Sequence, residues 1–429
     1  MDLPEAVELL DRHLNREARA GRIEGLSLDT MRRLMHVLGD PHRSFPVIHL
    51  TGTNGKGSVA RMATALLVES GLTVGTYASP HLERINERIA RNGEPIDDDE
   101  LARAIVDVVA IEPVAGVDAS WFELMTAAAF RWFAEVAVDV AVVEVGLLGR
   151  FDATNVVDAD VAVVTNVGLD HTDGVGDWRA AVASEKAGIV KPSSFLVLGE
   201  ADEALTPIFL AERPRGVWIR DVDFGTERNL AAVGGRLVDL RTPNGVVEQV
   251  FVPLHGRHQG DNAAVALAAV EAFFERGLPP EVVTDALAQV TVPGRFEVLG
   301  RAPLVVVDGA HNPPGAEVAA ETLADDFDVA GRRILVVGFL EGRDVGAMLE
   351  ALGAAEADLV VACTPRSPRA VPAEDVAAAA RALGVDAEVV ADVGHAVDAA
   401  LGVANADDAI LVAGSLYVAG AARTWLTTH

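Results

Sequence analysis

The sequence predicts an α/β protein built from two domains, and three observations support this expectation. Short runs of β-branched residues alternate with alanine-rich stretches along the chain, as in parallel sheets covered by helices on both faces. The 429 residues exceed what a single hydrophobic core usually holds. A segment at residues 225–253 is rich in glycine and turn residues, so it interrupts the alternation and predicts β-hairpins.

The predicted strands are short apolar runs, and most are followed by a helical stretch. They lie at residues 46–50, 138–145, 161–166, 304–308, 334–338, 359–363, 389–391 and 410–414. The hairpin segment is expected to cover one edge of the first domain. We assign residues 1–294 to the first domain and residues 295–429 to a smaller, Rossmann-like second domain, because a new α/β pattern begins after the turn at Pro293.

The composition excludes several kinds of partner. The chain carries 35 basic and 64 acidic residues, a formal net charge of −29, and such a surface repels nucleic acid and anionic membranes. The first twenty residues are charged throughout, and no apolar run approaches the roughly 20 residues of a membrane helix. The single cysteine, Cys363, lies in an apolar run and suits a reducing compartment. We therefore expect a cytoplasmic protein.

Lysine is scarce in this chain. Lys56, Lys186 and Lys191 are its only lysines, against 32 arginines. A guanidinium cannot replace a compact ammonium or an amine that must lose its proton. The positions that remain lysine are therefore candidates for such a role.

A glycine-rich loop follows the first predicted strand and precedes a helical stretch at residues 59–70. It reads Leu50-Thr-Gly-Thr-Asn-Gly-Lys-Gly-Ser58, and its glycines allow backbone N–H groups to point at phosphate oxygens. Lys56 can then reach the terminal phosphates, and the Ser58 hydroxyl can bind Mg²⁺. The spacing G-x-x-G-K-G-S differs from the common G-x-x-x-x-G-K-[ST] loop of GTPases and most kinases. We predict a P-loop ATP-binding domain, with a ligand-free turn as the alternative.

Three further polar side chains follow in the same predicted domain. Glu144 ends a strand beside a glycine turn, where a carboxylate can bind a phosphate-held metal; a structural salt bridge is the alternative. His171 closes a second loop after a strand, although a lone histidine is usually not a ligand. Lys186 could occupy a solvated helix face, but its deprotonated amine could also take up CO₂ and become a carbamate ligand for Mg²⁺.

The phosphate loop resembles the ATP loop of the Mur-ligase superfamily, and further motifs resemble its folylpolyglutamate/dihydrofolate synthase branch. Two departures, Leu148 and Phe151, replace a usual glycine and leucine and are expected to reshape a pterin pocket, whereas Arg343 replaces a usual lysine. The similar motifs span about residues 23–425 in the family's order, and they include Ser79-Pro-His-Leu82, residues 144–155, 165–171 and 185–191, His258-Gln259, residues 293–297, Asp308-Gly-Ala-His-Asn-Pro313 and Gly414-Ser-Leu-Tyr417.

The resemblance implies a role for each matching residue. The nucleotide would be bound by Asn54, Gly55, Lys56, Gly57, Ser58, Asn262, Arg295 and Asp308. The metal ligands would be Ser58, Ser79, Glu144, His171 and Lys186. The substrate would be contacted by Phe122, Glu123, Asp152, Asn155 and Ser415, the last on the glutamate or phosphate side. The catalytic residues would be Lys56, Lys186, His171 and His311.

The activity that the resemblance implies is the ATP-dependent joining of L-glutamate to a folate-type carboxylate. The acceptor, dihydropteroate or a tetrahydrofolate polyglutamate, would form an acyl phosphate, and the products would include ADP and phosphate. We expect two Mg²⁺ ions, one bound by Ser58, Ser79 and Glu144 and one by His171 and a carbamate on Lys186. The expected partners are these small molecules alone, and the expected state is a monomer.

Three other classes of protein are alternatives. A Mur-type ligase for a cell-wall nucleotide precursor shares the phosphate loop, but the Ser79-Pro-His-Leu82 and Gly414-Ser-Leu-Tyr417 runs favour folate. A P-loop kinase or nucleotide-dependent switch leaves the glutamate, histidine and lysine motifs without a purpose. A non-catalytic descendant is disfavoured because every candidate residue is chemically competent. Whether the acceptor is dihydropteroate, a reduced folate or both stays open.

Overall fold

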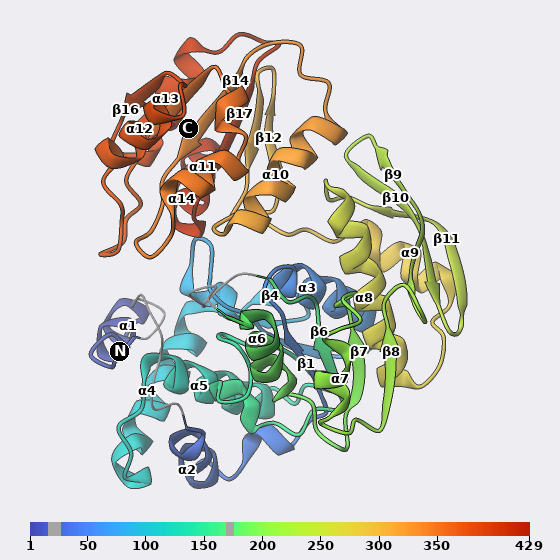
Figure 1. The fold of residues 1–429 in the computed structure, drawn as a ribbon. Coiled ribbons are helices and arrows are strands. Elements are labelled where there is room, and N and C mark those ends of the chain that lie inside the picture. Colours follow the sequence, from blue (N-terminus) through green and yellow to red (C-terminus); the bar gives the residue numbers. More distant parts are fainter. Residues whose placement is uncertain (16–26, 169–175) are drawn as a thin grey trace. The chain divides into compact units, whose positions relative to one another are not determined.

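The computed structural model describes residues 1–15, 27–168 and 176–429, and these residues form two compact units (Figure 1). The second unit also contains two short segments that the sequence assigns to the first domain, and the predicted boundary after residue 294 stays a prediction. The first unit comprises Met1–Asn229, Leu237–Val252 and Gly260–Val290, and the second comprises Leu230–Arg236, Pro253–Gln259 and Thr291–His429.

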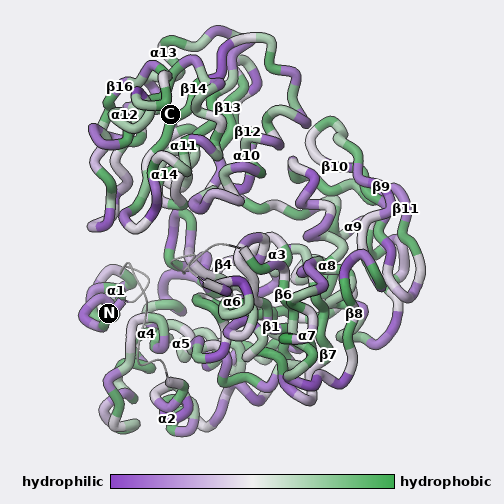
Figure 2. Tube along the Cα trace, in the orientation of Figure 1, coloured by the Kyte–Doolittle hydropathy of each residue, from purple (hydrophilic) through white to green (hydrophobic). Residues whose placement is uncertain are grey.

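The first unit is built around an eight-stranded sheet in the order β4-β3-β2-β5-β1-β6-β7-β8. Strands β2, β5, β1, β6, β7 and β8 are parallel, whereas β3 and β4 add an antiparallel edge. The central strands are buried throughout, as expected for a sheet covered on both faces. Figure 2 shows that the sheet is largely hydrophobic. The strands are β1 Val47–Thr51, β2 Val74–Tyr77, β3 Ile89–Arg91, β4 Glu94–Pro95, β5 Val140–Glu144, β6 Val161–Val164, β7 Phe195–Leu198 and β8 Gly216–Ile219.

Helices cover this sheet and supply most of its core. One apolar cluster packs α2, α4 and α5 against β2 and β5, and another packs α6 and α7 against β6 and β7. Helix α3 packs against β2 and β5 and also contacts α9. The helices are α1 Leu3–Leu10, α2 Asp29–Val37, η1 Pro41–Arg43, α3 Lys56–Glu69, η2 Ile85–Arg88, α4 Asp98–Ala115, α5 Trp121–Glu135, η3 Ala153–Val156, α6 Trp178–Ala187, α7 Thr206–Leu210, α8 Arg257–Phe274 and α9 Pro280–Ala288. The first three residues of α8 belong to the second unit.

The predicted hairpins are confirmed as a separate three-stranded sheet in the order β11-β10-β9. Its strands are β9 Gly225–Ala232, β10 Gly235–Thr242 and β11 Gly245–Val252, and two-residue turns join them. Strand β11 packs against α9. The expected cover of a domain edge stays a prediction.

The second unit contains a six-stranded sheet in the order β12-β13-β17-β14-β15-β16. All its neighbouring strands are parallel except the antiparallel pair β12 and β13, which confirms a Rossmann-like unit. The strands are β12 Glu297–Arg301, β13 Leu304–Val307, β14 Arg333–Val337, β15 Leu359–Ala362, β16 Ala387–Val389 and β17 Ala409–Ala413, and the helices are α10 Pro313–Asp326, α11 Val345–Ala351, η4 Ala354–Glu356, α12 Ala373–Ala382, α13 Val393–Val403 and α14 Leu416–Thr428.

Three sequence predictions need correction. The strand expected at residues 389–391 is wrong, because β16 spans Ala387–Val389 and is a half-exposed edge strand that does not require an apolar run. Helix α3 begins at Lys56 instead of residue 59, which places the phosphate-loop lysine and serine in its first turn. Strands β2, β3, β4, β7, β8 and β12 were not predicted. Within the described residues, no helix has the length and apolar character needed to cross a bilayer.

Candidate functional site

The loop between β1 and α3 has the backbone shape that its glycines predict. Gly52 and Gly55 have φ angles of 155° and 83°, in the region that favours glycine. A Cβ atom on Gly52 would lie 1.8 Å from Thr165 Oγ1, and one on Gly55 would lie 2.6 Å from Asn262 Oδ1. The loop therefore requires glycine at both positions. The same contact places the predicted nucleotide-binding residue Asn262 beside the loop.

Helix α3 begins in this loop with an open first turn. Gly55 occupies the N-cap, and as a glycine it has no side chain that could accept a capping hydrogen bond. The first N–H groups of a helix have no intrahelical acceptor, and the helix dipole makes this end positive. The first turn contains Lys56, Gly57 and the buried Ser58. This arrangement suits an anion such as a phosphate group.

A second segment, directly after β6, clamps the phosphate loop. The backbone N–H of Asn54 donates to Asn166 Oδ1 (2.9 Å), and Asn166 Nδ2 donates back to the carbonyl of Asn54 (3.1 Å). Thr165 Oγ1 donates to the same carbonyl at 2.6 Å. Sequence reasoning assigned no role to Asn166, although a polar residue following a predicted strand was an available signal.

Glu144 and Ser79 lie on the other side of the loop. Glu144 is the last residue of β5, is paired in register with Leu50 and is 4% exposed. Its Oε2 accepts from the backbone N–H of buried Ser79 at 3.4 Å, and its Oε1 lies 4.0 Å from Lys56 Nζ. The Lys56 ammonium also donates to the carbonyls of Gly52 and Thr53 at 3.1 and 3.3 Å. The structure thus brings the lysine, the carboxylate and Ser79 together.

The donors at this point fit Mg²⁺. The Glu144 carboxylate and the hydroxyls of Ser58 and Ser79 are hard oxygen donors of the kind this ion prefers, and they would hold it together with phosphate oxygens of a bound nucleotide. Across residues 1–15, 27–168 and 176–429, no cluster of three His, Cys, Asp or Glu side chains could hold a metal by itself. Glu144 is the one predicted ligand of those residue types within these ranges, since His171 lies outside the described residues.

Lys186 lies in the last turn of α6 and is only 4% exposed. The structure therefore excludes the solvated helix face as the explanation for this residue. Lys186 and Lys56 line the same small cavity of about 20 Å³, together with Gly52, Gly146 and Leu148. Two of the three lysines of the chain thus converge beside the phosphate loop.

Two predicted substrate-binding residues begin helix α5. The centre of the Phe122 ring lies 6.0 Å from that of the Tyr77 ring. A Cβ atom on Gly146 would lie 2.5 Å from Cζ of Phe122. Glu123 forms a capping box: its Oε2 accepts from the N–H of Ser120 at 2.8 Å. The carboxylate of Glu123 therefore has a structural task, and its contact with substrate stays a prediction.

Two further predicted substrate-binding residues, Asp152 and Asn155, are buried in the segment after β5. Burial raises the pKa of Asp152, whereas hydrogen bonds from Thr154 and Leu147 oppose this change. Asn155 Nδ2 donates to the carbonyls of Arg150 (2.9 Å) and Gly188 (3.0 Å). These bonds connect the loop to the end of α6, just after Lys186.

The second unit contains four predicted site residues, Arg295, Asp308, His311 and Ser415. They lie at the carboxyl ends of β13 and β17. Asp308 follows β13 and accepts from the N–H groups of Phe296 and Ala310, both at 2.7 Å. Burial raises its pKa, and the nearby charge of Arg295 opposes this change. His311 Nδ1 lies 2.9 Å from the carbonyl of Gly309. Buried Ser415 caps α14 by accepting from the N–H of Val418 at 3.2 Å.

An uncapped helix after a glycine loop, with lysines and a buried glutamate beside it, defines a P-loop nucleotide-binding protein. Comparison with protein families narrows this class. Residues 121–270 match the Mur ligase middle domain, and residues 294–416 match the Mur ligase, glutamate ligase domain.

The chain belongs to the folylpolyglutamate synthase/dihydrofolate synthase family. It is 40% identical to the dihydrofolate synthase/folylpolyglutamate synthase of Mycobacterium tuberculosis over 93% of this chain and 89% of that protein. A structure of the Mycobacterium tuberculosis folylpolyglutamate synthase complexed with ADP superposes with a TM-score of 0.92, at 39% identity over 100% of this chain and 98% of the other. A bifunctional folylpolyglutamate synthase/dihydrofolate synthase with Mn, AMPPNP and L-glutamate bound gives 0.86, at 29% identity and the same coverage.

Membership of this family confirms several predictions. The α/β fold with two units is confirmed, and so is the class of enzyme, an ATP-dependent Mur-type ligase that uses a nucleotide and a divalent metal. The roles of the individual site residues, the carbamate and the number of metal ions stay predictions.

Proposed function

We propose that this protein joins L-glutamate to the carboxylate of dihydropteroate, of a tetrahydrofolate polyglutamate, or of both, at the expense of ATP. The observation that carries the proposal is the convergence of Lys56 and Lys186 on one cavity, with Glu144 beside Lys56. The names of the relatives support the folate acceptor, and the bound AMPPNP, Mn and L-glutamate of one solved relative support the other reactants.

The first proposed step is phosphoryl transfer. A carboxylate oxygen of the acceptor attacks the γ-phosphorus of ATP, the bond to ADP breaks, and an acyl phosphate forms. Two anions must approach each other, so positive charge is needed where they meet. The Lys56 ammonium and the N–H groups of the first turn of α3 supply it, and Asn54, Gly55, Gly57 and Ser58 shape the loop around the phosphates.

Bound Mg²⁺ would neutralise further charge on the phosphate oxygens. Ser58, Ser79 and Glu144 would hold one ion, and His171 with Lys186 would hold a second. Lys186 can contribute an anionic oxygen only as a carbamate, which forms when its neutral amine adds to CO₂ and loses a proton. Its burial beside the phosphate loop supports this role, because a buried ammonium would otherwise repel the metal.

The second proposed step forms the amide. The amine of L-glutamate attacks the acyl carbon, phosphate leaves, and the nitrogen loses a proton. We assign nucleotide contacts to Asn262, Arg295 and Asp308, and contacts with glutamate or phosphate to His311 and Ser415. The pterin-bearing acceptor would face Phe122, Glu123, Asp152 and Asn155. We further propose that the enzyme acts as a cytoplasmic monomer on small molecules, without nucleic acid.

The test is ADP release measured with ATP, Mg²⁺ and L-glutamate, with dihydropteroate and tetrahydrofolate as separate acceptors. We expect ADP release that requires both glutamate and at least one acceptor, together with a product one glutamate heavier by mass spectrometry. A cell-wall nucleotide precursor serves as the control acceptor for the related Mur ligases. Absence of stimulation by both folate-type acceptors would refute the proposal, and stimulation by the control acceptor would favour the alternative ligase.

A further inference from the structure

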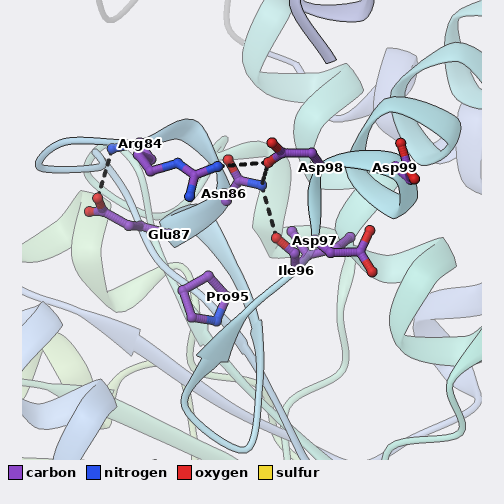
Figure 3. A pocket seen from close by; sticks show the side chains of 8 residues that line it. All are labelled: Arg84, Asn86, Glu87, Pro95, Ile96, Asp97, Asp98 and Asp99. Carbon is purple, nitrogen blue, oxygen red and sulfur yellow. Dashed lines mark hydrogen bonds and ion pairs between the residues drawn. The ribbon is translucent and has the colours of Figure 1, made fainter. Parts of the chain in front are cut away.

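Two cavities of the first unit differ in the charge of the side chains that line them. The larger cavity, of about 560 Å³, has four carboxylates and one guanidinium among its described lining residues. Arg84 and Asn86 both donate to Asp98 there, at 2.8 and 2.9 Å (Figure 3). The smaller cavity, of about 20 Å³, is lined by Lys56 and Lys186 instead. The carboxylates of the larger cavity repel anionic reactants, so the proposed reaction belongs at the smaller one.

Leu148 is an apolar residue at the edge of the smaller cavity. It lines this cavity, is half-buried, and packs against the apolar cluster of β6, β7 and α6. The other apolar side chain among the described lining residues is Val145, which is 1% exposed. Leu148 is therefore the apolar lining residue that lies between the cavity and solvent.

The backbone of Leu148 is in the left-handed region, with a φ of 58°. This conformation is strained for leucine and relaxed for glycine. In the part of the chain that the structure describes, Leu148 and Phe296 are the large apolar residues with a positive φ. Phe296 is 2% exposed within the core of the second unit, so core packing explains its conformation. Half-buried Leu148 has no such explanation, and its strain indicates a role for the side chain at the cavity.

The segment around Leu148 packs closely on both sides. A Cβ atom on Gly146 would meet the Phe122 ring, and one on Gly149 would lie 3.2 Å from Cα of Lys186. Leu148 thus lies between the proposed pterin-facing ring and the proposed carbamate lysine. An acceptor that extends from Phe122 toward the lysines would bring its carboxylate next to Leu148.

The proposed acyl phosphate can react with two nucleophiles. Attack of the glutamate amine on the acyl carbon gives the amide and phosphate. Attack of water on the same carbon regenerates the acceptor carboxylate and releases phosphate and a proton, so the net change is hydrolysis of ATP. Exclusion of water from the site suppresses this side reaction. The cavity has room for about one water molecule, and an apolar side chain offers that water no hydrogen bond.

We propose that Leu148 excludes water from the acyl phosphate and thereby determines how much of this intermediate becomes amide. This inference rests on the proposed function. Glycine would adopt the backbone conformation of Leu148 without strain, but it would leave the cavity open to solvent on this side. The strained leucine is therefore a residue that favours the amine over water as the nucleophile.

Three substitutions at this position test the inference. Leu148→Gly removes both the strain and the side chain, Leu148→Ala removes most of the side chain and keeps a positive φ, and Leu148→Met keeps a long apolar side chain. Wild type and Leu148→Met should form about one ADP per amide, whereas Leu148→Ala and Leu148→Gly should form at least about twofold more. A ratio of two products does not depend on the fraction of folded enzyme, so a purely structural role would not change it.

Ala137→Gly is the matched control for relief of strain. Ala137 also has a positive φ, of 49°, but it is an exposed residue just after α5. This variant should keep the wild-type ratio of ADP to amide. A changed ratio in Ala137→Gly would show that backbone strain, and not the leucine side chain, controls the outcome.

Oxygen-18 water identifies the step that is lost. Attack of labelled water on the acyl carbon places the label in the regenerated acceptor carboxylate, and we expect ATP-dependent labelling in Leu148→Ala and Leu148→Gly above that of the wild type. An unchanged ratio of ADP to amide in these variants, or a raised ratio without labelled acceptor, would overturn this inference alone. Wild-type enzyme that forms no amide with either folate-type acceptor would refute the proposed function, and this inference with it.

Discussion

In each unit a strand leads through a short loop into a helix, β1 into α3 in the first unit and β13 into α10 in the second. We call these two strand–loop–helix segments the first and the second corner, and they differ in how the helix begins. Helix α3 begins at Gly55, which has no side chain to cap the first N–H groups of the helix. Helix α10 begins at buried Asn312, whose Oδ1 accepts from the N–H of Gly315 at 2.9 Å, and two prolines follow the cap. The first corner can therefore bind an anion through its backbone, whereas the second has satisfied its own helix end and offers side chains instead.

The distribution of lysine follows the same division. All three lysines belong to the first unit, and the second unit relies on arginine, as at Arg295. An arginine keeps its charge under all conditions, which suits a fixed contact with a nucleotide. A lysine can lose its proton and react, which suits a carbamate. The first unit would thus contain the lysine that loses its proton and forms a carbamate. The second unit would contain arginines, whose charge stays constant.

Replacing Lys186 with arginine tests this division with the largest expected effect. The change prevents carbamate formation and leaves a fixed positive charge where the proposal has an anionic ligand, so we expect kcat to fall roughly 10³-fold, at the upper end for loss of one charge-stabilising group. Lys191→Arg is the matched control: this lysine, five residues on, donates to the carbonyl of Gly188 at 3.1 Å and should be replaceable. Steady-state ADP release gives kcat, and carbon-13 NMR with labelled CO₂ detects the carbamate. Full activity of Lys186→Arg would contradict the carbamate proposal.

Adding one methyl group to the first corner should have the next largest effect. In Gly52→Ala the new Cβ would lie 1.8 Å from Thr165 Oγ1, and alanine would have to adopt a φ of +155°. We expect a loss of about 3 kcal/mol in the free energy of unfolding, from strain and overpacking, and a fall in ATP affinity. Urea unfolding and calorimetric titration with ATP measure the two quantities.

Gly71→Ala, just past the other end of α3, provides the comparison for Gly52→Ala. It also has a positive φ, of +90°, but its Cβ would have no atom within 4 Å among the described residues. We expect a loss of about 1 kcal/mol and an unchanged affinity for ATP. Equal effects on ATP affinity at both ends of the helix would show that the first corner is not the phosphate site.

The contrast between the corners also explains what the sequence could predict. The glycines, Lys56 and Ser58 form a local pattern, so the loop, β1 and β5 were predictable from short stretches of chain. Asn166 was not assigned a role, because its two bonds to Asn54 join positions 112 residues apart. The cap at Asn312 was likewise not predicted, although the Asn-Pro-Pro run was visible. Among the edge strands, β8 was missed because its apolar run, residues 217–219, is only three residues long. Strand β16 was misplaced because it is half-exposed and its Glu388 interrupts any apolar run.

Acidification should destabilise both units through one histidine in each, the buried His49 and the half-buried His258. His49 is the third residue of β1. Burial lowers its pKa to about 3, and the charge of Lys191 lowers it by a smaller amount. Burial, and next the charge of Arg295, lower the pKa of His258 in the second unit to about 4. Since the folded pKa lies below the unfolded value of 6.5, the unfolded chain binds the proton first. Stability is complete above pH 6.5 and falls as the pH drops toward the folded pKa.

At pH 5 each histidine should reduce the free energy of unfolding by about 2 kcal/mol relative to pH 7. Urea unfolding at both pH values measures this difference in the wild type and in His49→Gln and His258→Gln, each of which should lose its share of the pH dependence. His36→Gln is the control, because the His36 side chain is 84% exposed. Below pH 4 the contribution of His258 should level off, while that of His49 should continue to grow. A pH dependence unchanged in both variants would show that neither histidine is held neutral.

Removing the cap of the second corner should have the smallest effect and separates its role from that of the first. Asn312→Ala leaves the N–H of Gly315 without its acceptor, which typically costs about 1 kcal/mol. Asn312→Asp keeps an oxygen acceptor at the helix N-terminus and should restore stability. If the second corner acts through side chains, the uncapped helix end of Asn312→Ala should not bind phosphate in its own right. Calorimetric titration with inorganic phosphate should therefore give the same result for the wild type and both variants. If Asn312→Ala instead gained phosphate binding, the helix cap, and not the loop sequence, would be what distinguishes the two corners.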